Sequence, residues 1–266
     1  MELSILIKAL LLGVIEGLTE FLPISSTGHL IIAGDLLGFT GDRANSFEIV
    51  IQLGAILAVF WFYRHRLMNV MRGLPSDPGA RKFVLNLAIA FAPAAALGFL
   101  FHDFIKEYLF TPIVVAVALI GGGFVILLIE RLPHRIRANR VDAMDWRDAL
   151  NVGLAQSLAL IPGVSRSGAT IMGGIVFGLS RRAATAFSFF LAIPVMFAAT
   201  GFDLLDNWDV LSPADLPVIA VGFIGAFLSA RVAIRFLLNY VAYHDFSAFA
   251  WYRIAFGLVV LAYYSL

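Results

Sequence analysis

A short polar stretch, residues 16–30, carries two carboxylates, four hydroxyls and a histidine within otherwise apolar sequence. Glu16 and Glu20 are four residues apart, so on a helix both carboxylates lie on one face, one turn from each other. Pro23 is expected to end that helix, because its ring clashes with the preceding turn and it has no N–H to donate. Two carboxylates on one face indicate a site for a cation or for proton transfer.

The residues after Pro23 predict the start of a second helix. It would run from Gly28 towards Leu37, and three residues of N-cap type precede it, Ser25, Ser26 and Thr27. Free N–H groups at a helix start attract anions, of which phosphate is the usual one. Acidic groups on one side and an anion cradle on the other indicate a phosphoester site, with or without a bridging cation.

The composition predicts a multi-spanning membrane protein. The 266 residues are 61% hydrophobic and 14% charged, with a mean hydropathy of +0.90, whereas a soluble protein is about half apolar and a quarter charged. The net charge of +1 gives no reason to expect a nucleic-acid partner, and without cysteine there is no thiolate metal site. The N-terminus lacks the basic region of a signal peptide, so we do not expect it to be cleaved.

The fold class expected is all-α. Full spans need about 20 apolar residues, and six stretches come close to this length: 47–63, 83–101, 113–129, 183–202, 218–238 and 248–266. Two pairs of shorter apolar runs, 3–15 with 30–39 and 149–161 with 169–179, are broken by Pro and Ser. Each pair predicts a re-entrant hairpin, which survives at membrane depth only where protein or a water-filled cavity surrounds it.

Basic loops give the expected orientation. Loops 64–82 and 131–147 are basic, and loop 239–248 lies between spans that carry arginines near it, so these three should lie in the cytoplasm. Loops 102–111 and 203–217 and both termini should then lie outside. The first hairpin would then enter from the outer face and the second from the cytoplasmic face. Three arginines of the last two spans are expected to extend towards the water at the membrane surface, Arg231, Arg235 and Arg253.

An internal repeat supports this inversion. Placing Ser25 on Ser165 aligns residues 13–47 with the second hairpin without a gap. The pairs that match include Gly13 with Gly153, Gly28 with Gly168, Gly34 with Gly174, Gly38 with Gly178 and Phe47 with Phe187, while Glu16 falls on Gln156. We therefore expect one membrane domain, 1–266, built from inverted repeats of about 1–130 and 141–266. In such folds the binding site lies where the broken tips meet, here 25–29 and 165–170.

Each candidate residue has a structural alternative to its functional role. The neighbours of Glu16 and Glu20 leave no polar face, which favours function over a solvated helix surface. Arg166 could simply follow the positive-inside rule, but its place between two serines favours a phosphate clamp. His29 could be satisfied by a backbone carbonyl, yet it shares its loop with hydroxyls, which favours proton transfer. Glu48 and Gln52 fit interhelical hydrogen bonds as well as a site role.

Two motifs then carry a family resemblance. The stretches are E-G-L-T-E-F-L-P-I-S-S-T-G-H-L at 16–30 and P-G-V-S-R-S-G-A-T at 162–170, supported by segments 47–54 and 186–194. The chain resembles the bacterial undecaprenyl-diphosphate phosphatases, also called bacitracin-resistance phosphatases. The resemblance implies an enzyme of the plasma (inner) membrane that converts undecaprenyl diphosphate into the lipid carrier of peptidoglycan synthesis. It also implies a divalent cation, Mg²⁺ or Ca²⁺, and a site that opens to the periplasm.

The resemblance also implies residue roles. The catalytic set would be Glu16, Glu20, Ser26, His29 and Arg166, with a metal on Glu16 and Glu20 and phosphate contacts from Ser25, Thr27, Ser165, Arg166, Ser167 and Thr170. Ser26, His29 and water all stay open as the nucleophile, with Ser26 favoured. A second lipid-phosphatase family pairs S-G-H with a further histidine, which this second motif lacks, so that mechanism is not carried over.

A flippase for polyprenyl phosphate could use the same inverted-repeat site. Membrane lipids and a polyprenyl diphosphate substrate are the expected partners, and a homodimer is an open alternative to a monomer.

Overall fold

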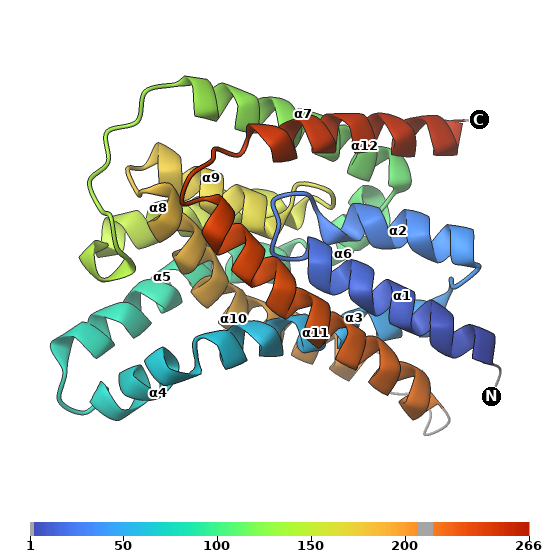
Figure 1. Ribbon diagram of the computed structural model, residues 1–266, viewed down its shortest axis with the longest axis horizontal. Coiled ribbons are helices and arrows are strands. Elements are labelled where there is room, and N and C mark those ends of the chain that lie inside the picture. The colour runs from blue at the N-terminus through green and yellow to red at the C-terminus, as the bar shows by residue number, and fades with distance from the viewer. Residues whose placement is uncertain (1–2, 207–214, 266) are drawn as a thin grey trace.

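The computed structural model describes residues 3–206 and 215–265, without the side chains of residues 42, 43, 45 and 203–206. Apart from one isolated bridge, all regular structure in these ranges is helical, as predicted (Figure 1). The α-helices are α1 Leu3–Thr19, α2 Ser26–Leu37, α3 Asp42–Phe62, α4 Arg64–Gly73, α5 Pro78–Leu100, α6 His102–Phe104, α7 Pro112–Arg131, α8 Trp146–Ser157, α9 Arg166–Val176, α10 Arg181–Asp206, α11 Leu216–Tyr240 and α12 Ser247–Ser265. Short turns of other helix types are η1 Ile105–Leu109, η2 Val141–Ala143 and η3 Leu158–Leu160.

Five helices in the described ranges are long and apolar enough to cross a membrane: α5, α7, α10, α11 and α12. A sixth span exists if α3 and α4, bent by 73° at their junction, count as one. The predicted loop 102–111 is instead largely helical, because α6 and η1 continue the chain with apolar and aromatic residues. Residues 207–214 of the predicted outer loop lie outside the described residues. The chain is thus a multi-pass membrane protein.

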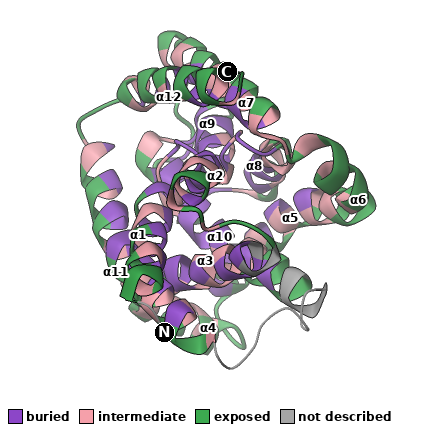
Figure 2. Ribbon diagram, turned by 90° about the vertical axis from the view of Figure 1, so that its right-hand side faces the viewer, coloured by how far each residue is buried: buried purple, intermediate pink, exposed green. Residues whose placement is uncertain are grey.

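The outer faces of these helices are apolar. Large side chains there are more than half exposed, among them Phe99, Val117, Leu128, Val232 and Val259. Figure 2 shows the buried residues gathered in the centre of the bundle and the exposed ones on its periphery. Such a surface suits contact with lipid, which has no hydrogen bonds to offer and requires backbone groups to be satisfied within helices.

The two predicted hairpins meet inside the bundle. Helix α1 packs along α11, and α8 packs along α5, while α7 packs along α12. The hairpins α1–α2 and α8–α9 approach from opposite ends of the molecule (Figure 1). Their tips touch: the hydroxyl of Ser167, at the start of α9, donates to the carbonyl of Leu22, between α1 and α2, at 2.8 Å. Polar segments far apart in sequence therefore come together at the centre of an apolar bundle.

The three loops predicted to be cytoplasmic, 64–82, 131–147 and 239–248, are joined by contacts at one end of the molecule. Arg66 pairs with Asp142 at 2.6 Å, which joins α4 to the loop before α8. The Glu130 carboxylate, at the end of α7, pairs with Arg181 and accepts from the backbone N–H of Phe246. At the opposite end, Tyr264 near the end of α12 donates to Asp35 of α2 at 3.3 Å.

The expectation that Arg253 reaches water is wrong. Its residue is 1% exposed, and its guanidinium donates to backbone carbonyls inside the bundle. Arg235 is exposed and Arg231 is half-buried. The difference arises because carbonyls of α7 and of the segments that follow α1 and α8 accept from Arg253 and satisfy its N–H groups without water.

Candidate active site

Two sharp turns form the site. We call residues 20–29 the first elbow and residues 161–170 the second elbow. Ser25, with φ 67°, and Ser165, with φ 74°, are the N-cap residues of α2 and α9. Within the described ranges they alone are non-glycine residues with positive φ. This conformation costs energy for a residue with a Cβ, and such strain gathers at functional sites.

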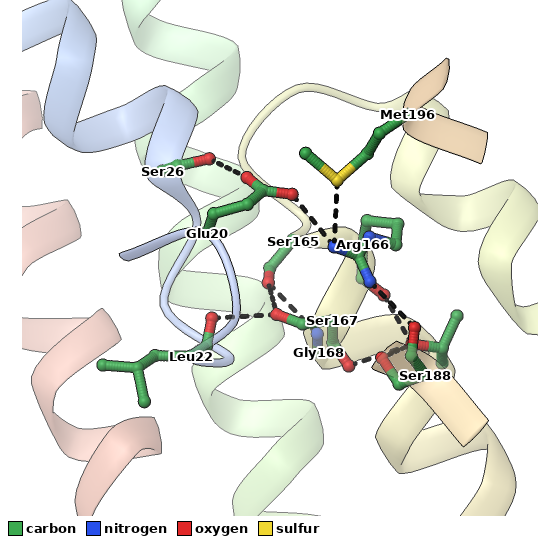
Figure 3. Close-up of polar contacts among 10 residues, drawn as sticks. Glu20, Leu22, Ser26, Ser165, Arg166, Ser167, Gly168, Ser188 and Met196 are labelled. Atoms are coloured by element: carbon green, nitrogen blue, oxygen red, sulfur yellow. Dashed lines mark hydrogen bonds and ion pairs between the residues drawn. The ribbon is translucent and has the colours of Figure 1, made fainter. Parts of the chain in front are cut away.

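Glu20 connects the two elbows. Its Oε1 accepts from Arg166 Nη2 at 3.0 Å, and its Oε2 accepts from the Ser26 hydroxyl at 2.5 Å (Figure 3). The side chains of Glu20 and Arg166 are each 12% exposed. Arg166 Nη1 also donates to the Ser188 carbonyl at 3.1 Å. A carboxylate, a hydroxyl and a guanidinium from distant parts of the chain thus form one network with little access to water.

The other hydroxyls of the second elbow have protein partners. Ser165 Oγ accepts from the Gly168 N–H at 3.1 Å and lies 3.0 Å from Ser167 Oγ. Thr170 Oγ1 donates to Ser188 Oγ at 2.7 Å. Phosphate contacts by these groups would have to replace bonds that already exist. Arg166 differs from these hydroxyls because its buried Nε has no hydrogen-bond partner.

The first elbow differs at its cap. Ser25 occupies the N-cap position, but its hydroxyl makes no capping hydrogen bond. Helix α2 begins at Ser26, two residues before the predicted start, so the hydroxyls of Ser26 and Thr27 project from its first turn. The cap interpretation thus holds for the backbone of Ser25 and is wrong for its side chain.

His29 is held by two partners outside the Glu20 network. Its Nδ1 lies 2.7 Å from the Ser25 carbonyl, and since a carbonyl only accepts, this nitrogen carries the proton. Its Nε2 lies 2.6 Å from the Tyr252 hydroxyl, and in the neutral ring this nitrogen accepts the hydrogen bond that the hydroxyl donates. The ring stacks on Phe256 with centroids 4.2 Å apart. None of the contacts described for His29 involves Glu20, Ser26 or Arg166.

Glu16 is fully buried, and neither of its carboxylate oxygens has a hydrogen-bond partner. A buried carboxylate in this state requires a proton or a cation. Within the described residues no group of three or more His, Cys, Asp or Glu side chains could hold a metal. Glu16 therefore has two oxygens available to a cation, whereas those of Glu20 are bonded to Ser26 and Arg166. A cation at these carboxylates would take its remaining ligands from phosphate and water, as Mg²⁺ usually does.

Sequence reasoning missed two groups of this region. Tyr252 and Phe256 flank His29, yet their spacing in an apolar span gives no signal of a site. Gln156, the repeat counterpart of Glu16, is buried with an amide that has no partner. In the described contacts neither Glu48 nor Gln52 hydrogen-bonds another helix, so the interhelical alternative gains no support.

The fold and these contacts define a class, a polytopic membrane protein with a polar, charged centre built from two broken helices. Comparison with known proteins gives the family. A family profile described as "Bacitracin resistance protein BacA" matches residues 9–259. The chain belongs to this bacitracin-resistance family, which confirms the resemblance seen in its motifs.

Curated relatives are similar along the whole chain. The undecaprenyl-diphosphatase of Nitrosospira multiformis is 61% identical over 261 residues, 98% of this chain and 96% of that protein. The undecaprenyl-diphosphatase of Nitrosomonas europaea is 61% identical over 261 residues, 98% of this chain and 95% of that protein. The undecaprenyl-diphosphatase of Ectopseudomonas mendocina is 57% identical over 266 residues, 100% of this chain and 96% of that protein.

Proposed function

We propose that this protein is a membrane phosphatase that hydrolyses undecaprenyl diphosphate to undecaprenyl phosphate and inorganic phosphate. The names of relatives with 57% and 61% identity support this activity. The observation that carries the chemistry is Glu20, which bridges the Ser26 hydroxyl and the Arg166 guanidinium. The product would return to peptidoglycan synthesis, and rapid removal of the diphosphate would give bacitracin resistance.

In the proposed reaction Ser26 is the nucleophile and Glu20 its base. Ser26 Oγ attacks the terminal phosphorus while Glu20 takes the hydroxyl proton. The anhydride bond from this phosphorus to the bridging oxygen breaks, and undecaprenyl phosphate leaves. Glu20 first gives its proton to the departing phosphate oxygen; water then attacks the phosphoserine while Glu20 takes a proton from the water and passes it to Ser26 Oγ, which releases inorganic phosphate and restores Ser26. The 2.5 Å contact supports Ser26 over His29, whose ring nitrogens are both engaged elsewhere.

Arg166 is proposed to bind the phosphate oxygens. Its two Nη atoms face Glu20 and the Ser188 carbonyl, so the planar group is already oriented before substrate arrives. Guanidinium gives paired hydrogen bonds to phosphate, and fixed charge is the main catalytic contribution in phosphoryl transfer. The backbone N–H groups at the starts of α2 and α9 would add further donors.

A divalent cation, Mg²⁺ or Ca²⁺, is proposed to bind at Glu16 and Glu20. The unpartnered, buried oxygens of Glu16 support this placement. When bound, the cation would neutralise charge on the diphosphate. Ser25 and His29 keep a supporting role here, since the Ser25 carbonyl and the Tyr252 hydroxyl fix the imidazole beside the first elbow.

We further propose six spans and two re-entrant hairpins arranged as inverted repeats within a single domain, 1–266. The like φ values of Ser25 and Ser165 support a duplication. So do the ends of α2 and α9, where Phe39 N–H bonds to Gly34 O and Leu179 N–H bonds to Gly174 O, each at 2.8 Å.

Orientation follows from charge. The basic end of the molecule would face the cytoplasm and the other end the periplasm, with the site open to the periplasmic side of the inner membrane. The contact between Arg66 and Asp142 supports this arrangement, because it places two basic loops on one side.

Trapping the phosphorylated enzyme tests the mechanism. Purified protein given a polyprenyl diphosphate labelled in its terminal phosphate should form an acid-stable phosphoserine at Ser26. Ser26→Ala should abolish both the label and phosphate release, and Glu20→Gln should slow release by about 10²–10⁴-fold. Ser157→Ala, which removes a hydroxyl that bonds to its own helix at 3.3 Å, is the matched control. An acid-labile label on His29, or normal turnover in Ser26→Ala, would contradict the proposal.

The same assay separates hydrolysis from transport. Phosphate release by detergent-solubilised protein requires no translocation of lipid. No observation on the described residues favours the carrier, since its transported anion would not need a hydroxyl hydrogen-bonded to a carboxylate.

A further inference from the structure

Arg253, near the start of α12, is buried in the centre of the bundle without a carboxylate among its described partners. Its guanidinium donates to five backbone carbonyls instead. Nη1 reaches Pro23 O at 3.2 Å and Val164 O at 2.9 Å, Nη2 reaches Gly163 O at 3.0 Å and Ala118 O at 3.1 Å, and Nε reaches Leu119 O at 3.3 Å.

These acceptors belong to three separate segments. Pro23 lies in the first elbow, Gly163 and Val164 lie in the second elbow, and the remaining two carbonyls lie in α7. Where a helix breaks inside a membrane, its carbonyls lose their intrahelical partners and need donors from elsewhere in the protein. The planar fork of arginine offers five N–H groups in fixed directions and no acceptor, so it can satisfy several carbonyls at once.

Room for the guanidinium comes from glycine. A Cβ added to Gly122 of α7 would lie 2.2 Å from Arg253 Nη2, whereas a Cβ on the neighbouring Gly121 would meet nothing within 4 Å. Gly122 therefore leaves space for the Arg253 guanidinium. Gly121 is a matched control position, because a side chain there would not contact Arg253.

We propose that Arg253 is a positioning residue of the phosphatase site, which holds the two elbows at the separation where Glu20, Ser26 and Arg166 meet. This inference rests on the proposed function. Arg253 touches neither the Glu20 network nor Ser26, so it acts through the backbone of the elbows. Because Pro23 is three residues from Glu20 and Val164 two residues from Arg166, loss of the shared fork would let the carboxylate and the guanidinium separate.

Lysine at this position tests the fork separately from the charge. Its single ammonium has three donors and no planar geometry, so Arg253→Lys cannot bridge all three segments. Gly122→Ala tests the same contact with Arg253 intact, since the added methyl group displaces Nη2. Arg235→Lys on the exposed face of α11 and Gly121→Ala are the controls.

The decisive readout is the distance between the hairpins. The chain contains no cysteine, so spin labels on cysteines introduced at Leu36 of α2 and Phe177 after α9 would report on the two elbows without background. A second pair at Leu85 of α5 and Leu154 of α8 lies within one packed pair of helices. Arg253→Lys and Gly122→Ala should broaden the distances of the first pair only, and neither control should change either pair.

Kinetics supply the functional half of the test. Misplacement of reacting groups by about 1 Å costs about 100-fold in rate, so both variants should lose kcat on this scale with little change in KM. The controls should stay within about twofold of the wild type. Folded variants that keep their kcat, or that lose it while the first pair keeps a narrow distribution, would overturn the inference. Should Arg253→Lys fail to fold, Gly122→Ala decides.

An error in the proposed function would be distinguishable from an error in the role proposed for Arg253. Wild-type protein that releases no phosphate would refute the phosphatase assignment, while the label distances, which need no substrate, would still report whether Arg253 holds the elbows together.

Discussion

The two elbows have the same backbone conformation at their helix starts and differ in their side chains. Each starts a helix from a serine in the left-handed region, with φ 67° at Ser25 and 74° at Ser165. In the second elbow the serine hydroxyl caps its helix and bonds within the loop. In the first elbow the hydroxyl makes no capping bond, and the neighbouring Ser26 hydroxyl bonds to Glu20 instead.

This difference shows how one turn can serve two tasks. The strained backbone exposes N–H groups at a helix start within the membrane, which suits an anion in either elbow. The side chains then differ in their roles: the first elbow carries the Glu20 carboxylate and Ser26, the proposed nucleophile, and the second carries the Arg166 guanidinium. The ion pair of Glu20 with Arg166 joins the two halves of this division.

The largest effect is expected at Arg166. An arginine at the transition state of phosphoryl transfer is worth about 10³–10⁵ in rate, so Arg166→Ala should lower kcat by at least about 10³-fold. Arg166→Lys keeps the charge but loses the paired hydrogen bonds to phosphate, so its kcat should lie between those of the wild type and Arg166→Ala. Phosphate release measures both, with melting temperature in detergent as the check on folding.

An exchange of charges sharpens the comparison. Glu20→Arg combined with Arg166→Glu restores an ion pair between the elbows without restoring the base beside Ser26. This double variant should fold better than either single reversal and stay inactive. Recovered turnover would show that the elbows are interchangeable and would refute their division of roles.

Glu16 and Gln156 give the next effect, because they occupy equivalent places and both are buried without partners. Glu16→Gln should raise the cation concentration needed for half-maximal activity by about 10–100-fold, the usual range for weakened metal sites. Gln156→Leu removes unpaired polar atoms and should raise the free energy of unfolding by about 1 kcal/mol with activity kept. Unchanged cation dependence in Glu16→Gln, measured by titration after chelation, would contradict the proposed site.

Much of this arrangement could be predicted from sequence. The i, i+4 spacing of Glu16 and Glu20, the breaker Pro23 and the repeat placed two helix starts in contact, and Glu20 does meet Arg166 at 3.0 Å. These signals are local or periodic, so the chain itself displays them. The all-helical fold and its long apolar spans follow from hydropathy in the same way.

Long-range partners could not be predicted. Arg253 obeys the positive-inside rule in sequence, yet its acceptors converge from the elbows and α7 only after packing. His29 is 223 residues from Tyr252, and no spacing rule joins them. The hydroxyl of Ser25 has the right type for a cap, but side-chain direction depends on local backbone geometry that residue type does not specify.

The two N-cap serines predict a smaller effect, on stability. Ser165→Ala removes a bond to the Gly168 N–H and should lower the free energy of unfolding by about 1 kcal/mol. Ser25→Ala loses no capping bond, so its melting temperature in detergent should fall less. Equal losses, or a larger loss for Ser25→Ala, would show that the two caps are alike after all.

The smallest effect is expected at the start of the second hairpin, where Asp142 holds the loop before α8 against α4. The hydrogen bond from Arg66 lowers the pKa of Asp142 below its usual value. A lowered pKa in the folded state means that the stabilisation is complete above the unfolded pKa of about 3.9 and is lost as pH falls through the folded value. Because the Asp142 side chain is 53% exposed, solvent limits the gain in the free energy of unfolding to about 0–1 kcal/mol.

Asp142→Asn should therefore have a slightly lower melting temperature than the wild type at neutral pH. This difference in melting temperature should disappear on acidification and shrink in high salt. A difference in melting temperature that persists in acid would mean that Asp142 acts through packing and not through its charge. A pH-dependent ion pair would then no longer distinguish the second hairpin from the first.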